Sequence, residues 1–489
     1  MSDNLGTTEK ELVRVRTEKL EKIEKMGINP YPNSAKKDYS SQRILAISSE
    51  LIASGQRIYY SGRIIASRGH GKLSFFDVAD EQGKIQVILK EDLLAKDAGL
   101  IPLLDIGDFI EVAGKIFMTN SGEITIEVIE LKVVAKALRP LPDKRHGITD
   151  EEVRYRKRYL DLLTNPELRD LFHKKAKFWQ SIRNFLIEKG FLEVETPVLE
   201  TTTGGADATP FVTHHDALDI DVYLRISMGE LWQKKLLVGG FEKTFEIGRQ
   251  FRNEGISREH LQDYSQMEFY WAYANYDDSM LLVEDLYKKI AKETFGTYKF
   301  TIGNHEVDLD KDWERIDYTE TIKSKLGIDI LSVSDDELTA KIKEFGLEHK
   351  KSDTKGRMID SLWKSIRGSI SGPAFVINHP VEVSPLAKRK SDNPKLTERY
   401  QVIIAGSELG NGYSELNDPR DQKQRFIEQA RMREGGDSEA QMNDESFIEA
   451  LEYGMPPATG FGLSERLFAF FVDKPIRECV LFPLVRPEK

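Results

Sequence analysis

A cluster of charged side chains lies near the middle of the chain, between two segments that alternate like β-strands. Residues 244–247 predict the end of one strand, and residues 264–270 predict the returning strand of an antiparallel hairpin. The loop between them carries Arg252, Glu254, Arg258 and His260. A loop held between two rigid strands can present such groups to a polyanion, and arginine suits phosphate and carboxylate. A solvated hairpin tip without a function is the alternative that these residues leave open.

The composition is that of a globular enzyme. The chain has 489 residues, of which 40% are hydrophobic and 31% charged, enough for two or three domains with substantial cores. No run of about 18 apolar residues occurs, and the amino-terminal residues lack the apolar segment of a signal peptide. Cys479 is the only cysteine, which excludes an intramolecular disulfide and cysteine-rich metal sites. We therefore expect a cytoplasmic protein with no membrane partner, and the net charge of −11 argues mildly against indiscriminate binding of nucleic acid.

The first part of the chain predicts a helix followed by a small β-barrel. Residues 8–27 alternate acids and bases around apolar positions at helical spacing. A charged helix packed on a neighbour and an arm that touches RNA both fit this pattern. From Ile58 the period changes to two, and short β-rich runs separated by glycine turns fit a five-stranded oligonucleotide-binding barrel. Phe75 and Phe76 are adjacent, so only one of them can point outward, where it could stack on a base.

These patterns divide the chain into three parts, of which the last is the largest. We assign 1–56 to an amino-terminal helical region, 57–140 to the barrel and 141–489 to a larger domain, with a proline-containing linker over 138–144. Within the larger domain, residues 305–370 predict a charged helical insertion.

The larger domain is predicted to mix helices and strands. Residues 150–163 predict one helix, and a long amphipathic helix ending at Gly190 leads into a strand broken at Pro197. Residues 400–404 predict a buried strand that runs into an acidic, glycine-rich turn. A last apolar helix is predicted over 467–472.

Three segments of the larger domain resemble the three sequence motifs of the class II aminoacyl-tRNA synthetases. Phe251-Arg252-Asn253-Glu254 with its loop and returning strand resembles motif 2, and the long helix with the strand at Pro197 resembles motif 1. Gly460, Gly462 and Arg466 before an apolar helix resemble motif 3. Further matches resemble the lysine-specific enzymes of that group: Gly204-Gly205-Ala206, Thr213-His214-His215, Tyr223-Leu224-Arg225 and Gly239-Gly240.

The resemblance implies both a fold and a reaction. The fold would be α+β, with a five-stranded OB-fold β-barrel before a class II catalytic domain built on a mostly antiparallel sheet flanked by helices. The reaction would activate L-lysine with ATP, release pyrophosphate and transfer lysine to the 3′ end of tRNA(Lys). The family implies a homodimer, with motif 1 at the interface. The chain has neither a GxxxxGK[ST] phosphate loop nor the HIGH and KMSKS signatures of class I enzymes.

The resemblance also assigns roles to individual residues. Arg252 and Arg466 would be catalytic, and the ATP site would comprise Arg252, Glu254, His260, Tyr264 and Arg466. Positioning and electrostatics dominate phosphoryl chemistry, so arginine side chains and Mg²⁺ are the expected agents. The lysine site would comprise Gly205, Glu230, Glu268, Tyr270, Asn411, Tyr413 and Glu415, with Glu230 and Glu268 at the α-amino end and Glu415 and Tyr270 at the ε-ammonium. Bases of the anticodon would meet Arg63, Phe75, Gln86 and Glu123.

Two departures from the lysine-specific pattern concern the metal and motif 3. Glu408 is the expected Mg²⁺ ligand, but seven residues before it Gln401 replaces the usual second acid, and a neutral amide binds Mg²⁺ more weakly. Motif 3 is one residue shorter than usual and lacks its last glycine. The paired His214 and His215 allow a metal site in principle, but the sequence places no third ligand near them.

Other functions remain possible at this point. An aspartyl- or asparaginyl-type ligase of the same subclass is the nearest alternative. A paralogue that attaches lysine to a translation factor would lack the anticodon barrel. A non-catalytic RNA-binding paralogue is favoured only by the shortened motif 3 and by Gln401.

Overall fold

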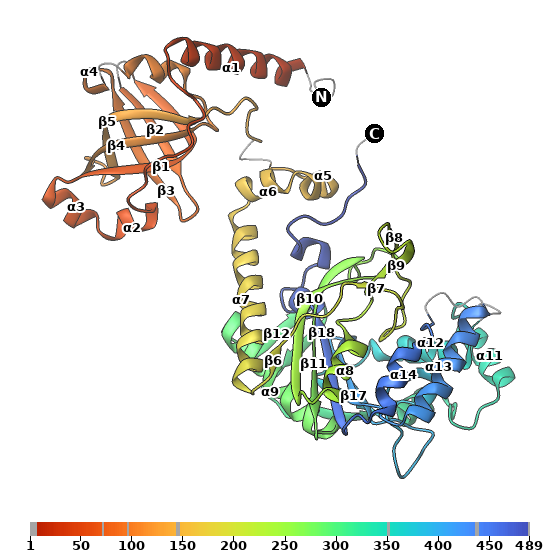
Figure 1. The fold of residues 1–489 in the computed structure, drawn as a ribbon. Coiled ribbons are helices and arrows are strands. Elements are labelled where there is room, and N and C mark those ends of the chain that lie inside the picture. The colour runs from red at the N-terminus through yellow and green to blue at the C-terminus, as the bar shows by residue number, and fades with distance from the viewer. Residues whose placement is uncertain are drawn as a thin grey trace. The chain divides into compact units, whose positions relative to one another are not determined.

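The computed structural model describes residues 7–70, 73–94, 97–142, 147–349, 353–435 and 440–487, so the end of the predicted linker lies outside the described residues. The chain divides into two compact units. One comprises the described residues up to Asp150 together with Tyr159–Thr164, and the other comprises Glu151–Arg158 and the residues from Asn165 onward. Figure 1 shows the elements of each unit.

The amino-terminal unit is a closed five-stranded barrel, as predicted. Its strands are β1 (Arg57–His70), β2 (Leu73–Ala79), β3 (Lys84–Lys90), β4 (Phe109–Met118) and β5 (Ile124–Ala135), in the order β1-β2-β3-β5-β4. Neighbours pair antiparallel except β3 and β5, which are parallel. Phe76 lies in the barrel core, and Phe75 faces outward opposite Arg68 and Ile88. This confirms the expectation that only one of the two rings points outward.

Short helices accompany the barrel. They are α1 (Thr7–Lys25), α2 (Ser41–Ala46), α3 (Ser48–Ser54), α4 (Glu91–Leu94) and the 3-10 helix η1 (Ala98–Leu103). Helix α1 packs on the barrel unit through Ile23, which is fully buried. Arg16 of α1 is also buried, and its guanidinium donates hydrogen bonds to the carbonyl oxygens of Ile106, Ala137 and Arg139. The charged helix therefore covers a neighbouring element.

An eight-stranded, mostly antiparallel sheet forms the centre of the second unit. Its order is β14-β15-β16-β17-β18-β11-β10-β6, and only the two outermost pairings are parallel within this sheet as described. Its strands are β6 (Leu192–Glu193), β10 (Lys243–Phe251), β11 (Asp263–Ala272), β14 (Glu314–Asp317), β15 (Ala374–Ile377), β16 (Arg399–Ile404), β17 (Ser407–Ser414) and β18 (Ala458–Ser464). A three-stranded sheet of β7 (Leu199–Glu200), β9 (Ile220–Leu224) and β8 (Val212–His215) and a hairpin of β12 (Lys299–Ile302) and β13 (His305–Asp308) complete the β-structure.

Helices accompany the strands of the second unit. The first helices after the barrel are α5 (Glu151–Arg156), α6 (Arg158–Thr164), which lies almost wholly in the first unit, α7 (Pro166–Glu188) and α8 (Glu230–Val238). They are followed by α9 (Tyr276–Phe295), α10 (Tyr318–Leu326), α11 (Asp335–Glu344) and α12 (Lys355–Arg367). The last are α13 (Pro419–Glu434), α14 (Glu445–Glu452) and α15 (Arg466–Phe471), with short 3-10 helices η2 (Val381–Val383) and η3 (Ile476–Cys479). Helix α9 packs on β16, β17 and β18, and its Tyr287 meets a stack of rings that includes Phe461 and Tyr400. The candidate active site lies on the opposite face of these strands.

The predicted acidic, glycine-rich turn is wrong, because this segment is the central strand β17. Glycine commonly marks turns, but here it allows close packing within the sheet. A Cβ at Gly410 would lie 2.6 Å from the ring of Phe461, and one at Gly412 would lie 2.6 Å from the ring of Tyr400. The glycines thus let the aromatic core under α9 approach the backbone.

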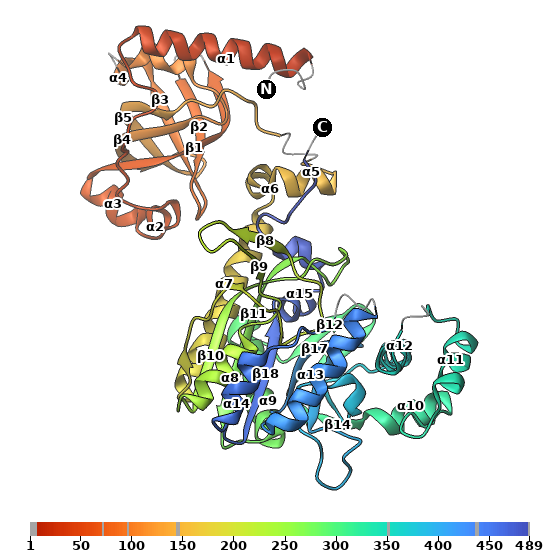
Figure 2. The ribbon, with the colours of Figure 1, turned by 45° about the vertical axis from the view of Figure 1, so that its right-hand side comes forward.

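Other predicted elements have different boundaries. The helix predicted over 150–163 is divided into α5 and α6 at Lys157, and the strand at Pro197 is divided into β6 and β7, which belong to different sheets. The block 305–370 is not helical throughout: it starts with β13 and with β14, a charged edge strand of the central sheet. Figure 2 shows α10, α11 and α12 grouped beside β14. Trp363 lies in the core of this group.

Candidate active site

The hairpin predicted around the charged loop is formed by β10 and β11, whose register pairs Phe251 with Asp263. The loop is tied to its surroundings. The backbone N–H of Arg252 donates to the carbonyl of Gln262 across the loop at 2.8 Å, and Asn253 N–H donates to Thr209 O at 2.8 Å. Further along the loop, Arg258 pairs with Asp473 at 3.0 Å. A freely solvated tip is therefore not what the structure contains.

Arg252 and Arg466 line the same cavity, of about 290 Å³. The Nε–H of Arg252 donates to the carbonyl of Ile226 at 3.3 Å, and its guanidinium lies 5.9 Å from the ring centroid of Tyr264. Burial alone would lower the pKa of Arg252, but the neighbouring Tyr264, Glu254 and Glu268 outweigh it and raise that pKa. The arginine therefore stays charged in a partly buried site, where it would bind an anion more strongly than in bulk water.

Arg466 opens helix α15 and is held by two neighbouring segments. Its Nη2 donates to the carbonyl oxygen of Glu408 at 2.5 Å and lies 3.3 Å from the carboxylate of Glu259, which comes from the β10–β11 loop. Its buried Nε has no hydrogen-bond partner among the described residues. A buried N–H donor without an acceptor fits a place for a ligand oxygen.

The remaining residues predicted for the nucleotide divide between two cavities. Tyr264 lines the first cavity, and His260 lines an adjacent one of about 320 Å³ that also reaches Arg252 and Arg466. Glu254 is exposed and is not among the lining residues of either cavity.

Two glycines of β18 make the floor of the first cavity. A Cβ at Gly460 would lie 2.4 Å from Oε1 of Glu415, and one at Gly462 would lie 3.1 Å from Glu268. Side chains there would fill the space between β11 and β17. Gly205 is equally constrained, since its φ is +85° and a Cβ would lie 2.5 Å from Ser227 Oγ.

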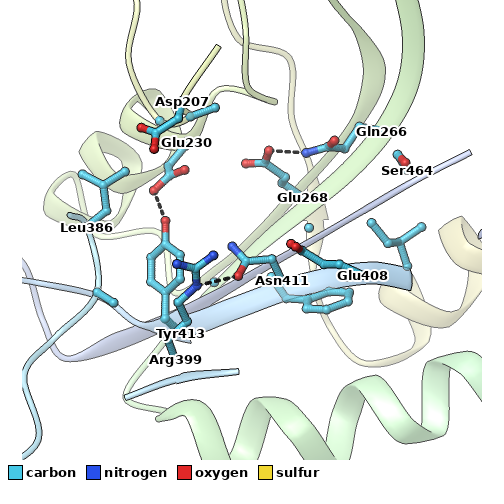
Figure 3. Close-up of a pocket in the computed structure, with 18 of the residues that line it drawn as sticks. Asp207, Glu230, Gln266, Glu268, Leu386, Arg399, Glu408, Asn411, Tyr413 and Ser464 are labelled. Carbon is cyan, nitrogen blue, oxygen red and sulfur yellow. Dashed lines mark hydrogen bonds between the residues drawn. The ribbon is translucent and has the colours of Figure 1, made fainter. Parts of the chain in front are cut away.

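The residues predicted to bind the amino acid converge at one end of this cavity. All seven line it: Gly205, Glu230, Glu268, Tyr270, Asn411, Tyr413 and Glu415. Figure 3 shows Glu230, Glu268 and Glu408 pointing into the cavity from α8, β11 and β17. The hydroxyl of Tyr413 donates to Glu230, and Glu268 accepts hydrogen bonds from Met228 N–H, Gln266 and the Tyr270 hydroxyl.

A buried lysine that the sequence reasoning missed stands among these acids. Lys234 of α8 is 1% exposed, and its ammonium lies 2.7 Å from Glu230 and 2.6 Å from Glu415. The rings of Tyr270 and Tyr413 surround it at 5.9 and 5.5 Å. The spacing Glu230-x-x-x-Lys234 is the sequence feature that indicates this ion pair, because residues four apart on a helix share a face.

The three buried carboxylates Glu230, Glu268 and Glu415 exceed the single ammonium of Lys234 by two charges. Burial raises the pKa of Glu268 to about 7, with repulsion from Glu230 as the next cause. Burial likewise raises the pKa of Glu415 to about 8, against the opposing effect of Lys234. A ligand with two positive charges would offset the cost of keeping Glu268 and Glu415 ionised in a buried place.

Of the barrel residues predicted to meet bases, Arg63, Phe75 and Gln86 lie on strands, and Glu123 lies in the turn before β5. The side-chain amide of Gln86 donates to Glu123 at 3.1 Å, and its oxygen Oε1 accepts a hydrogen bond from the hydroxyl of Thr125. Arg63 lies near the middle of β1, before Arg68, which is opposite Phe75, and its guanidinium is 4.2 Å from the ring centroid of Phe109. Arg68 and Lys84, which the sequence reasoning did not name, pair with Asp77 at 3.4 and 2.7 Å.

Comparison with known proteins agrees with this architecture. The family model described as tRNA synthetases class II (D, K and N) matches residues 150–486, and the OB-fold nucleic acid binding domain model matches residues 60–134. The chain is 46% identical to the lysine–tRNA ligase of Carboxydothermus hydrogenoformans, over 98% of both chains. It is 45% identical to the lysine–tRNA ligase of Thermotoga maritima, over 98% of this chain and 97% of the other.

This chain belongs to the class II tRNA synthetases. It therefore has the two-unit composition expected of that family, with a nucleic-acid-binding barrel and a synthetase domain. None of the helices that the structure describes has the length and apolarity needed to span a bilayer.

The expected Mg²⁺ position of the synthetase offers only one carboxylate. The Nε2 amide of Gln401 donates to Oε2 of Glu408 at 2.8 Å, and Arg367 Nη1 lies 3.8 Å from the same oxygen. Among the described residues no three acidic, histidine or cysteine side chains are grouped to hold a metal, and His214 instead faces Asp219 and Asp221. The residues at Glu408 therefore do not fit a site that holds a divalent cation by protein ligands alone.

The raised carboxyl pKa values predict that lysine binds this synthetase better as pH rises. A cationic ligand requires Glu268 and Glu415 to be ionised, and with pKa values of about 7 and 8 both are substantially protonated at pH 6. We expect the KM for lysine in ATP–pyrophosphate exchange to fall about 10-fold or more between pH 6 and pH 8. The variant Glu268→Gln should flatten this profile, and a KM that does not change with pH in the unaltered protein would contradict the assignment.

Proposed function

We propose that this synthetase activates L-lysine with ATP and transfers it to the 3′ end of tRNA(Lys). The observation that carries the proposal is the acidic cluster at the amino-acid pocket: three buried carboxylates outnumber the one buried ammonium among them by two, while Arg252 and Arg399 line the same cavity. Lysine brings two ammonium groups to match the two extra carboxylates. The names of the similar ligases support the same choice.

In the first step a carboxylate oxygen of lysine attacks the α-phosphorus of ATP and pyrophosphate leaves. Arg252, charged and buried next to the acidic pocket, would hold the lysine carboxylate and the α-phosphate together. Arg466, with its unpartnered Nε, would bind the terminal phosphates together with His260. Tyr264 would pack on the adenine, and Glu254 would accept a hydrogen bond from its amino group.

In the second step a hydroxyl of the terminal ribose of the tRNA attacks the carbonyl carbon, and AMP leaves. We place the two ammonium groups of lysine at Glu230 with Glu268 and at Glu415 with Tyr270, with Asn411, Tyr413 and Gly205 along the wall. Glu408 would be the residue that faces any Mg²⁺ accompanying ATP, although Gln401 and Arg367 beside it do not fit a site that holds the ion by protein ligands alone. The bases of the anticodon would meet Arg63, Phe75, Gln86 and Glu123.

We further propose a cytoplasmic homodimer. Several apolar side chains around β6, β7, β8 and β9 are exposed, among them Leu192 at 50%, Val212 at 59% and Leu218 at 63%. Exposed apolar side chains are candidates for a surface that a partner covers. The helix and strand of motif 1 belong to this region.

Aminoacylation of total tRNA with lysine, aspartate and asparagine tests the proposal. We expect charging with lysine alone, because the carboxylate of aspartate would face three buried acids and asparagine would leave them unpaired. Charging with aspartate or asparagine but not with lysine would refute it, and charging with none would favour the non-catalytic paralogue.

A further inference from the structure

The second cavity is bordered by a charged face of α12, the last helix of the group beside β14. Asp360, Lys364 and Arg367 follow each other at helical spacing and line this cavity together with His260 and Arg466. Lys364 is paired with Asp360 at 2.7 Å. Arg367 is the last residue of α12, and it reaches the carboxylate of Glu408.

Glu408 is surrounded by donors. Its Oε2 accepts a hydrogen bond from the Gln401 amide at 2.8 Å and lies 3.8 Å from Arg367 Nη1, and its own carbonyl accepts from Arg466 at 2.5 Å. The side chains of Arg367 and Glu408 are 19% and 31% exposed, so solvent screens this pair only in part. A divalent cation bound to Oε2 would have to displace an amide donor and approach a guanidinium.

The local charges balance without a metal. Glu408 and Arg367 cancel each other, and Gln401 is neutral. In a site with acids at both 401 and 408, one divalent cation would likewise cancel the charges of the two carboxylates. A guanidinium cannot be deprotonated in a protein, and its planar donors suit phosphate oxygens. The arginine can therefore supply fixed positive charge beside the phosphates, although it cannot act as a Lewis acid.

We propose that Arg367 substitutes for a divalent cation at Glu408, so that this synthetase binds ATP with one cation fewer than a site with two acids would hold. The proposal rests on the proposed function only in placing ATP in this cavity. Arg367 and Gln401 together keep a cation from Glu408. An acid at position 401 would restore the cation site, and the guanidinium of Arg367 opposes the binding of a cation there.

Counting bound Mn²⁺ by electron paramagnetic resonance tests the proposal, with a non-hydrolysable ATP analogue at saturation. The double variant Arg367→Met with Gln401→Glu should bind one more Mn²⁺ per chain than the unaltered protein. The single variant Gln401→Glu should bind the same extra ion about 10-fold more weakly than the double variant, because Arg367 still opposes it. Arg315→Met, on the exposed strand β14, is the matched control and should leave the count unchanged.

Equal Mn²⁺ counts and affinities in the unaltered protein and both variants at position 401 would overturn the proposal. So would an unaltered protein that already binds the extra ion at Glu408. Failure of the ATP analogue to bind the unaltered protein would instead refute the proposed function, and the two results are distinguishable because binding of the analogue is measured separately.

Discussion

Replacing Arg252 by alanine is expected to lower lysine-dependent ATP–pyrophosphate exchange by about 10³-fold or more. Removal of one preorganised donor to a developing negative charge typically costs a factor of about 10² to 10³, and a lost arginine at a transferring phosphoryl group can cost more. Arg252 is charged in a buried cavity shared with Arg466 and faces the acidic pocket.

The control for this variant is Arg249→Ala on β10, the strand that leads to Arg252. Arg249 is 44% exposed, and it pairs with Asp263. We expect less than about a threefold change in exchange, since exposed ion pairs contribute little. An Arg252→Ala protein that is folded by circular dichroism and retains exchange within about tenfold of the unaltered protein would contradict the role of this residue.

The variant Glu415→Gln is expected to raise the KM for lysine by about 10²-fold or more, with a smaller effect on the KM for ATP. Breaking a buried ion pair by removing one partner costs roughly 3–5 kcal/mol. Glu415 is 1% exposed, and the change would reduce the excess negative charge of the pocket from two to one. Lys234 keeps Glu230 as its partner, so the fold should tolerate the change.

A Glu→Gln change on α14 is the control for Glu415→Gln, because it makes the same chemical change outside the pocket. Glu449 is exposed, and Glu449→Gln should leave both KM values unchanged. A Glu415→Gln protein with an unchanged KM for lysine would mean that Glu415 serves Lys234 alone. The amino-acid pocket would then have to be placed elsewhere.

Much of the barrel and of the β10–β11 hairpin could be predicted from the alternation of apolar and polar residues. The same alternation decides which side chains of a strand are buried. Alternation along β11 puts Met267 and Phe269 into the core, while Gln266, Glu268 and Tyr270 face the cavity. The convergence of Arg252 and Arg466, by contrast, came from the resemblance to the family motifs, because 214 positions separate them along the chain.

Other features depended on long-range packing and could not be predicted. The glycines of β17 predict a turn, because the rings that require Gly410 and Gly412 come from other elements and cannot be read from the local sequence. The group beside β14 was predicted as wholly helical, since β14 is short and charged. Lys234 was missed because burial of a lysine is exceptional unless acids on other elements meet it, and Glu415 lies 181 positions away.

The most direct test of the account compares L-lysine with two analogues that each lack one ammonium group, in ATP–pyrophosphate exchange. L-norleucine lacks the ε-ammonium, and 6-aminohexanoate lacks the α-amino group. Because each would leave one of the two excess negative charges uncompensated, we predict that kcat/KM falls by about 10³-fold or more for both. Exchange supported by norleucine as well as by lysine would contradict the claim that the buried carboxylates select a doubly cationic amino acid.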